Sequence, residues 1–244
     1  MDALAYHTLR DLQDRHWWFV GRRTIIEQLI HRFVKLPKSP RILEAGCGYG
    51  GNLEMLGKFG ELNAFEYEDE ARAYASALSA RPVEKGFLPD RVGFDNDRFE
   101  LIAMLDVLEH IQDDGGSLRA LRERLSEDGS LLVTVPAMPW LWSEHDEVHH
   151  HKRRYTKAAL QKLLKESGYE LVSTGYFNTL LFPLALLQRL AARLFRIPHR
   201  VETLPPWPLN GLLGRIFGFE SRLVGRLAAP VGLSLYAVAR QARG

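Results

Sequence analysis

A short apolar strand that runs directly into a glycine-rich turn, over residues 41–52, constrains this chain more than any other stretch. Glycine has no Cβ, so it tolerates positive φ angles and lets backbone amides approach a ligand closely. The spacing fits two patterns, Gly-x-Gly-x-Gly at 46, 48 and 50 and the dinucleotide pattern Gly-x-Gly-x-x-Gly at 46, 48 and 51. The turn therefore predicts a nucleotide-like ligand and leaves its identity open.

Apolar runs alternate with helical patterns through most of the chain. The predicted strands are 41–45, 62–65, 82–85, 99–105, 130–135, 169–176 and 234–240. The predicted helices are two within 2–34, joined at 16–23, and then 52–59, 68–78, 116–125 and 156–167. This alternation implies right-handed βαβ crossovers and a parallel sheet. Ligands of such α/β sheets bind beyond the carboxyl ends of the strands.

Composition divides the chain into four parts. These are an N-terminal helical cap (1–40), a ligand-binding core (41–178) with a polar and aromatic segment inside it (137–155), an apolar and basic helical insertion (179–232) and the last core strand (233–244). The insertion carries Arg189, Arg193, Arg196 and Arg200 at helical spacing beside an apolar face. These parts predict one α/β body with additions at both ends.

Charge is unevenly distributed along the chain. Residues 176–244 hold nine Arg against two Glu, a net charge of +7, whereas the preceding residues carry a net charge of −5. A basic, apolar segment on an acidic body favours peripheral contact between 179–232 and anionic lipid, or a homodimer interface. The formal charge of +2 favours no particular partner, and no nucleic-acid partner is expected. Cys47 is the only cysteine, so we expect a cytoplasmic protein, with peripheral contact at the inner face of the membrane as the further expectation from 179–232.

Three carboxylate positions separate the candidate ligands. Glu44 lies two residues before the first glycine, where it can meet an ammonium group or order the loop. Glu66 follows the second predicted strand, about 20 positions on, and is placed to accept hydrogen bonds from ribose hydroxyls. An acid-rich stretch, Asp106-x-x-Glu109-His110, follows the strand 99–105. A nicotinamide cofactor needs neither the first nor the last of these.

In these three motifs the sequence resembles the class I S-adenosylmethionine-dependent methyltransferases of the type 11-like group, over 41–168 and the last strand. The resemblance implies a Rossmann-like, seven-stranded, mostly parallel sheet with helices on both faces. It also implies S-adenosylmethionine as cofactor, with the methionine part on the glycine loop, ribose at Glu66 and adenine in the loop after residue 86. The implied cofactor-binding residues are Glu44, Gly46, Cys47, Gly48, Gly50, Glu66, Tyr67, Phe87, Leu88, Asp106 and Val107.

Acceptor residues are expected in the segment after the fifth strand. Methyl transfer needs alignment and removal of the acceptor's proton, and histidine titrates near neutrality. The candidate bases are His110, His145 and His151, with His149 and His150 beside them. The segment to Tyr155 resembles one found in a bacterial subgroup of these enzymes. The expected acceptor-binding residues are Trp17, Trp18, Trp140, Arg153, Arg154 and Tyr155.

No metal is expected, although Asp106, Glu109 and His110 resemble the ligands of the ubiquinone-pathway O-methyltransferases and form the alternative. We expect O-methylation of an apolar or lipid-linked small-molecule acceptor. Two other functions remain open, an NAD-dependent oxidoreductase and a non-catalytic, membrane-associated binding protein of the same fold.

Overall fold

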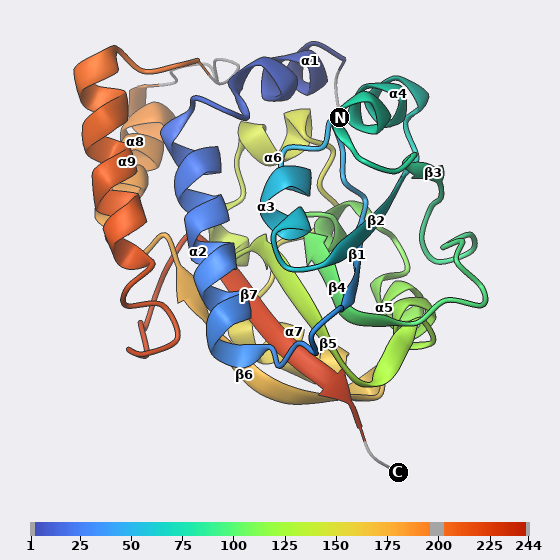
Figure 1. The fold of residues 1–244 in the computed structure, drawn as a ribbon. Coiled ribbons are helices and arrows are strands. Elements are labelled where there is room, and N and C mark those ends of the chain that lie inside the picture. The colour runs from blue at the N-terminus through green and yellow to red at the C-terminus, as the bar shows by residue number, and fades with distance from the viewer. Residues whose placement is uncertain (1–2, 196–202, 243–244) are drawn as a thin grey trace.

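A central mixed sheet organises the protein, which is described by a computed structural model over residues 3–195 and 203–242. The sheet has seven strands in the order β3-β2-β1-β4-β5-β7-β6 (Figure 1). The strands are β1 (Arg41–Ala45), β2 (Glu61–Glu66), β3 (Glu84–Lys85), β4 (Phe99–Leu105), β5 (Leu125–Pro136), β6 (Tyr169–Phe177) and β7 (Ser234–Gln241). Only β7 runs antiparallel to its neighbours, β5 and β6. The predicted fold class is confirmed.

Helices cover both faces of this sheet. They are α1 (Ala3–Leu12), α2 (Trp17–Phe33), α3 (Leu53–Gly57), α4 (Asp69–Leu78), α5 (Asp114–Arg122), α6 (Glu144–Val148), α7 (Lys157–Glu166), α8 (Phe182–Phe195) and α9 (Trp207–Glu220), with short 3-10 turns η1 (Leu108–His110) and η2 (Pro139–Leu141). Adjacent residues of β1 point to opposite faces. Ile42 packs in a core with α2, α3 and α9, whereas Leu43 packs in a core with α5 and α7.

The N-terminal helices differ from the prediction. The joint is shorter than 16–23, because α2 already begins at Trp17 and His16 is its N-cap, with a side chain that accepts a hydrogen bond from the Trp18 amide at 3.3 Å. Both tryptophans therefore lie in the first turn of α2. Trp17 packs edge-on against Phe217 of α9, with 5.6 Å between ring centroids.

Two further boundaries differ from the prediction. Strand β5 begins at Leu125, five residues before the predicted start, and its pairing with β4 shifts register between Phe99 and Leu101. Because the start of β5 is irregular, its first residues lack the alternation of apolar and polar residues that predicts a strand. The segment 137–155 also contains α6, which the sequence did not predict; Ser143 caps it through a reciprocal hydrogen-bond pair with Asp146.

The insertion contributes to the core as well as to the surface. Phe217 of α9 is fully buried and lies against Gly21, where a side chain would collide with its ring. This contact fixes α9 beside α2 (Figure 1). Arg196 and Arg200 of the predicted basic series lie outside the described residues. In the described ranges, every helix is too short or too polar to cross a membrane.

Candidate active site

One large cavity opens at the carboxyl ends of β1, β2, β4 and β5. Its volume is about 2050 Å³, which exceeds the roughly 300–1,000 Å³ of a typical small-molecule pocket and leaves room for two ligands. The glycine loop, Glu66, Asp106 and Val107 line one side. The start of α2, the turn η1, the segment 140–154 and α8 line the other. We call these two sides the cofactor half and the acceptor half.

The glycine loop supplies the floor of the cofactor half. Gly46, Gly48 and Gly50 have φ angles of 75°, 55° and 82°, which side chains rarely adopt. A Cβ on Gly50 would lie 2.7 Å from the Leu53 side chain, whereas a Cβ on Gly48 would meet nothing within 4 Å. The loop is therefore closed underneath and open toward the cavity, as a close approach of a ligand to its backbone requires.

Glu66 ties this loop to the end of β2. Its Oε2 accepts a hydrogen bond from the Gly48 amide at 2.7 Å, and its Oε1 accepts from the amides of Tyr67 and Glu68 at 2.8 and 3.0 Å. The carboxylate is buried and lines the cavity. Because each carboxylate oxygen has two lone pairs, Oε2 retains capacity for a ribose hydroxyl.

Glu44 lies beneath the loop rather than on the cavity wall. Its Oε1 accepts a hydrogen bond from Asn52 Nδ2 at 2.7 Å, and its Oε2 has no partner among the described residues. Burial raises the pKa of the Glu44 carboxyl to about 7. Of its two expected roles, this position fits the ordering of the loop. Cys47 does line the cavity, and burial raises the pKa of its thiol, so it is no thiolate nucleophile.

Aromatic rings form the rim of the cofactor half. Tyr67 and Phe87 lie edge to face with 6.0 Å between ring centroids, and both are partly exposed. Leu88 lines the cavity beside them. The expected adenine-binding residues thus come together at the end of the cavity next to Glu66.

Asp106 connects the cofactor half to the N-terminal cap. Its backbone is left-handed, with φ of 56°, and its Oδ2 accepts a hydrogen bond from Thr134 Oγ1 at 3.1 Å. The same oxygen forms an ion pair with Arg22 Nη2 at 2.5 Å. Arg22 also reaches Asn52 and lies 5.2 Å from the Trp18 ring centroid. Val107 packs against Gly46, where a Cβ would be only 3.0 Å from its methyl groups.

Sequence reasoning missed Arg22, although it is buried and lines the cavity. The available signal was its helical spacing from Trp18, four residues earlier. That spacing was lost when 16–23 was interpreted as a joint between helices. Arg22 thus links the N-terminal cap to the glycine loop and to the end of β4.

Four histidines gather in the acceptor half. The three expected bases are brought together with a fourth, His149: the ring centroids are 4.7 Å apart for His110 and His151, 4.3 Å for His145 and His149, and 6.1 Å for His145 and His151. We call these four the histidine cluster. His150 has a left-handed backbone, is exposed and does not line the cavity.

A buried carboxylate, Asp146, orients the cluster and was also missed. Its Oδ1 lies 2.9 Å from His151 Nδ1 and accepts a hydrogen bond from Arg154 Nε at 2.7 Å. These bonds hold the pKa of the Asp146 carboxyl well below its usual range despite burial. Arg154 also donates to the Ala137 carbonyl at 3.1 Å. Arg154 lines the cavity, but its charge is already paired with Asp146.

The remaining expected acceptor residues divide into two groups. Trp17, Trp18 and Trp140 line the cavity. Arg153 and Tyr155 do not, because Arg153 Nη1 and the Tyr155 hydroxyl both donate to Asp114 Oδ2, at 2.6 and 2.9 Å. They fasten the segment to α5 instead of facing the acceptor half.

Arg189 of α8 supplies a cation on the cavity wall that the sequence did not single out for the site. Its guanidinium donates to the Leu141 carbonyl, and burial lowers its pKa to about 10. Its place follows from the docking of α8 over η2, a long-range contact that no local pattern encodes.

Comparisons with known proteins agree with this geometry. A family model described as a methyltransferase domain matches residues 19–174, well over half of the chain. A search of curated proteins found no sequence match. The finer similarity to ubiquinone-pathway O-methyltransferases stays a prediction.

Solved structures of several proteins share the fold. A Haloferax volcanii protein in complex with the methyltransferase activator Trm112 has a TM-score of 0.62 and 14% identity, covering 98% of this chain and 95% of its own. The [4+2]-cyclase SpnF has a TM-score of 0.59 and 16% identity, covering 91% and 82%. An S-adenosylmethionine-dependent methyltransferase from Clostridium acetobutylicum has a TM-score of 0.57 and 12% identity, covering 90% of each chain. At these identities the likeness shows the fold alone.

The family match decides between the two cofactors that the glycine spacing left open. It spans the glycine loop, Glu66 and the stretch after β4, which are the three motifs of the resemblance. The chain belongs to the methyltransferase domain family and is an S-adenosylmethionine-dependent enzyme of the class I, Rossmann-like type.

Proposed function

We propose that this enzyme transfers the methyl group of S-adenosylmethionine to an oxygen atom of an apolar or lipid-linked acceptor. The observation that carries the proposal is the division of one cavity into a glycine-lined half and a half with histidines beneath an apolar wall. Donor and acceptor bound in the two halves would meet near Asp106 and Val107. Such alignment is the main source of rate in a displacement reaction.

The cofactor half fits S-adenosylmethionine residue by residue. The open face of Gly48 accommodates the methionine backbone, and Glu66 has capacity for a ribose hydroxyl. The Tyr67 and Phe87 rings offer apolar surface for adenine. The bound cofactor would supply a methyl group on a positively charged sulfur, so the protein needs to position the acceptor and remove its proton.

The acceptor half favours an apolar ligand. Its wall is formed by leucines of the α8 and α9 region, and the cavity-lining members are Leu181, Leu184, Leu186, Leu190, Leu209 and Leu213. Trp140 adds an aromatic surface, with its ring 6.4 Å from that of Phe182. The histidine cluster supplies polar groups that can accept the acceptor's proton.

Transfer of labelled methyl groups tests this function. The enzyme is incubated with S-adenosyl-[methyl-³H]methionine and either the chloroform–methanol extract or the aqueous extract of bacterial cells. We expect label in the organic extract, in a base-stable linkage typical of an ether. Label confined to the aqueous extract would overturn the apolar acceptor, and cofactor binding without label in either extract would favour a non-catalytic binding protein.

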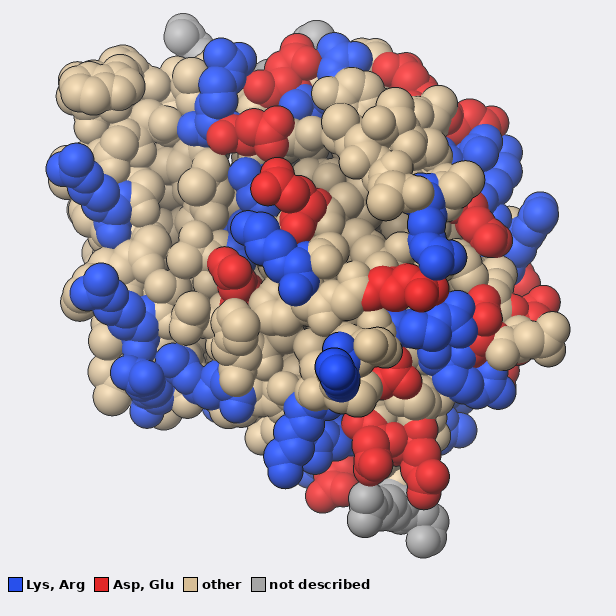
Figure 2. Space-filling model, viewed as in Figure 1, with Lys and Arg blue, Asp and Glu red and all other residues tan. Residues whose placement is uncertain are grey.

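The outer face of the insertion supports work at a membrane surface. Side chains of α8 and α9 are exposed there and do not line the cavity; they are Leu187, Leu194, Phe195, Trp207, Leu212 and Phe219. Leu194 and Trp207 are 77% and 87% exposed. Arg215, Arg222 and Arg226 are exposed nearby. We call this surface the apolar-basic face, and in Figure 2 the flank over α9 is tan with scattered blue.

Among the described residues of the insertion, no acid neutralises the face. Glu220, the described acid of the insertion, is buried and accepts hydrogen bonds from the amides of Thr179 and Leu180. An apolar surface edged with arginine matches the interface of a bilayer that contains anionic lipid. We therefore infer peripheral contact with the inner face of the membrane, where a lipid-linked acceptor would be presented to the neighbouring cavity.

Sedimentation with lipid vesicles tests the membrane contact. At low salt we expect binding to vesicles of phosphatidylcholine with 30% phosphatidylglycerol and weaker binding to phosphatidylcholine alone. Leu187→Glu with Trp207→Glu should abolish binding, whereas Leu78→Glu on α4, also at an exposed leucine, should not. A concentration-dependent dimer that is lost in the double variant, without vesicle binding, would assign the face to a homodimer instead.

A further inference from the structure

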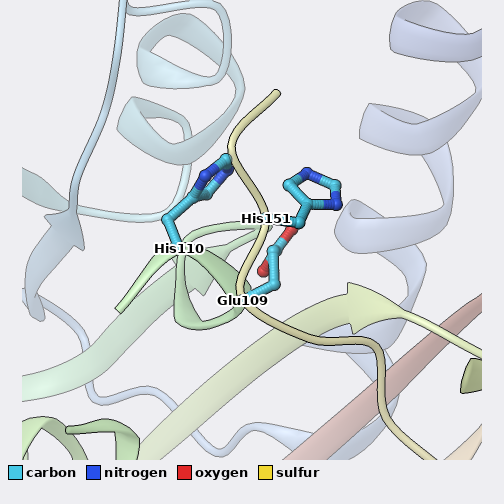
Figure 3. A group of neighbouring side chains, drawn as sticks. All are labelled: Glu109, His110 and His151. Atoms are coloured by element: carbon cyan, nitrogen blue, oxygen red, sulfur yellow. The ribbon is translucent and has the colours of Figure 1, made fainter. Parts of the chain in front are cut away.

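Three cavity-lining side chains offer metal-ligand atoms at one point of the acceptor half. Glu109, His110 and His151 each provide one such atom, and the three atoms lie within 4.8 Å of one another. Figure 3 shows Glu109 and His110 rising from the turn after β4 and His151 entering from a separate segment. The Lys152 amide donates to the Glu109 carbonyl at 2.7 Å, which fastens that segment to the turn.

The His151 imidazole is oriented from behind, as metal-binding histidines are. Its Nδ1 is held by Asp146, itself fully buried and fixed by Arg154 and Ser143, so Nε2 is the nitrogen left for a ligand. Metal-ligating histidines almost always use their second nitrogen in such a bond. The His110 ring lies edge to face against the His151 ring, with 4.7 Å between ring centroids.

Glu109 supplies a second observation at the same point. Its side chain is 1% exposed, and Oε2 has no hydrogen-bond partner among the described residues. A buried, unpartnered carboxyl group is costly unless a cation or proton compensates it.

Asp106 does not belong to this group, in contrast to the ligand set that the sequence suggested. Its Oδ2 is occupied by Arg22 and Thr134. The arginine occupies the place beside Asp106 that a metal ion would need. The candidate ligands are therefore two histidines and one carboxylate, with His151 contributed by the acceptor segment.

We propose that Glu109, His110 and His151 bind a divalent transition-metal ion that activates the acceptor oxygen. Two histidines and one carboxylate leave coordination positions open and suit ions such as Mn²⁺, Fe²⁺ or Zn²⁺. This rests on the proposed function. The bound ion would polarise the acceptor hydroxyl and lower its pKa, and the proton would pass to His145 or solvent. The oxygen would then attack the methyl carbon: the O–C bond would form as the S–C bond breaks, leaving a neutral thioether and one proton, with no change in oxidation state.

Metal binding is tested on the untagged chain after chelator treatment, by titration with Co²⁺. We expect one Co²⁺ per chain with visible d–d absorption, and displacement by Zn²⁺. Glu109→Gln, His110→Asn and His151→Asn should each weaken binding by about 100-fold or more, and Asp146→Asn by roughly 10- to 100-fold. The matched control is His150→Asn, at the adjacent exposed histidine, which should bind as the wild type does.

Binding of S-adenosylhomocysteine verifies that each variant is folded. Absence of Co²⁺ binding, or equal binding by the ligand variants and the control, would overturn the site while leaving the proposed function intact. Metal binding together with full methyl transfer in excess chelator would overturn the role in acceptor activation. If no extract accepts label under any condition, the proposed function fails, and the Co²⁺ titration still decides whether the site exists.

Discussion

The two halves of the cavity are built in different ways. The cofactor half consists of consecutive residues in special backbone conformations, with Gly46, Gly48 and Gly50 at positive φ and one carboxylate holding them. The acceptor half is assembled from side chains of four distant segments, which meet only because α2, η1, the 137–155 segment and α8 pack together. The cofactor half depends on local sequence, whereas the acceptor half depends on tertiary contacts. We therefore expect that substitutions can impair cofactor binding and methyl transfer separately.

The largest expected effect is on the acceptor half. His151→Asn removes the side chain that Asp146 orients, so we expect the methyl-transfer rate to fall by about 1,000-fold, the scale of a lost proton-transfer or metal-activation group. Affinity for S-adenosylhomocysteine should stay within about twofold, because His151 lies in the opposite half. Single-turnover rates and calorimetry check both, with His150→Asn as the control. A cofactor affinity that falls along with the rate would contradict the division.

Glu44 should produce the next largest effect, on stability. Its pKa is raised from 4.5 to about 7 in the folded state, so the native protein keeps a proton that the unfolded chain has lost between these values. The free energy of unfolding should therefore fall as pH rises through this window, by about 2.5 kcal/mol between pH 5 and pH 8.

Glu44→Gln removes this titration. Urea unfolding of both proteins across that pH range should show the wild type losing stability relative to the variant. Parallel stability curves for the two proteins would mean that the Glu44 carboxyl does not titrate in this pH range, which would contradict the prediction.

Glu66 tests the cofactor half directly. Glu66→Ala removes the acceptor for the Gly48 amide and for a ribose hydroxyl, so we expect S-adenosylhomocysteine to bind about 30-fold more weakly, or about 2 kcal/mol. Glu54→Ala, at an exposed acid of α3 that does not line the cavity, is the matched control. Unchanged affinity in Glu66→Ala would place the ribose elsewhere.

The smallest expected effect concerns the apolar-basic face. Single substitution Leu194→Gln should weaken vesicle binding only several-fold, because one leucine contributes about 1–2 kcal/mol of burial at an interface. Methyl transfer to a detergent-dispersed acceptor should be unchanged, since Leu194 does not line the cavity. A loss of activity in detergent would mean that the face belongs to the acceptor half.

The sequence predicted the sheet and the cofactor half because both depend on local patterns. Apolar runs marked the core strands, and the spacing of Glu44, Glu66 and Asp106 from the glycines marked the ligand. Strand β5 was the exception in length, because its first residues have neither alternation nor a continuous apolar run.

The acceptor half could be predicted only in part. The three candidate bases could be named from residue type, and they do meet. Arg22, Asp146 and Arg189 were missed, because each acts through a partner that is distant in sequence or through a cap that looked like a loop. For the same reason Arg153 and Tyr155 were expected to face the acceptor, whereas Asp114 at the start of α5 engages both.

The most direct test compares the cofactor half with the acceptor half in one experiment. The rate of methyl transfer to one organic extract is measured as a function of S-adenosylmethionine concentration for Glu66→Ala and His151→Asn. Glu66→Ala should recover most of the wild-type rate at saturating cofactor. His151→Asn should saturate at the wild-type cofactor concentration with a rate about 1,000-fold lower. If saturating cofactor rescues His151→Asn, or fails to rescue Glu66→Ala, the two halves are not separate and the account is contradicted.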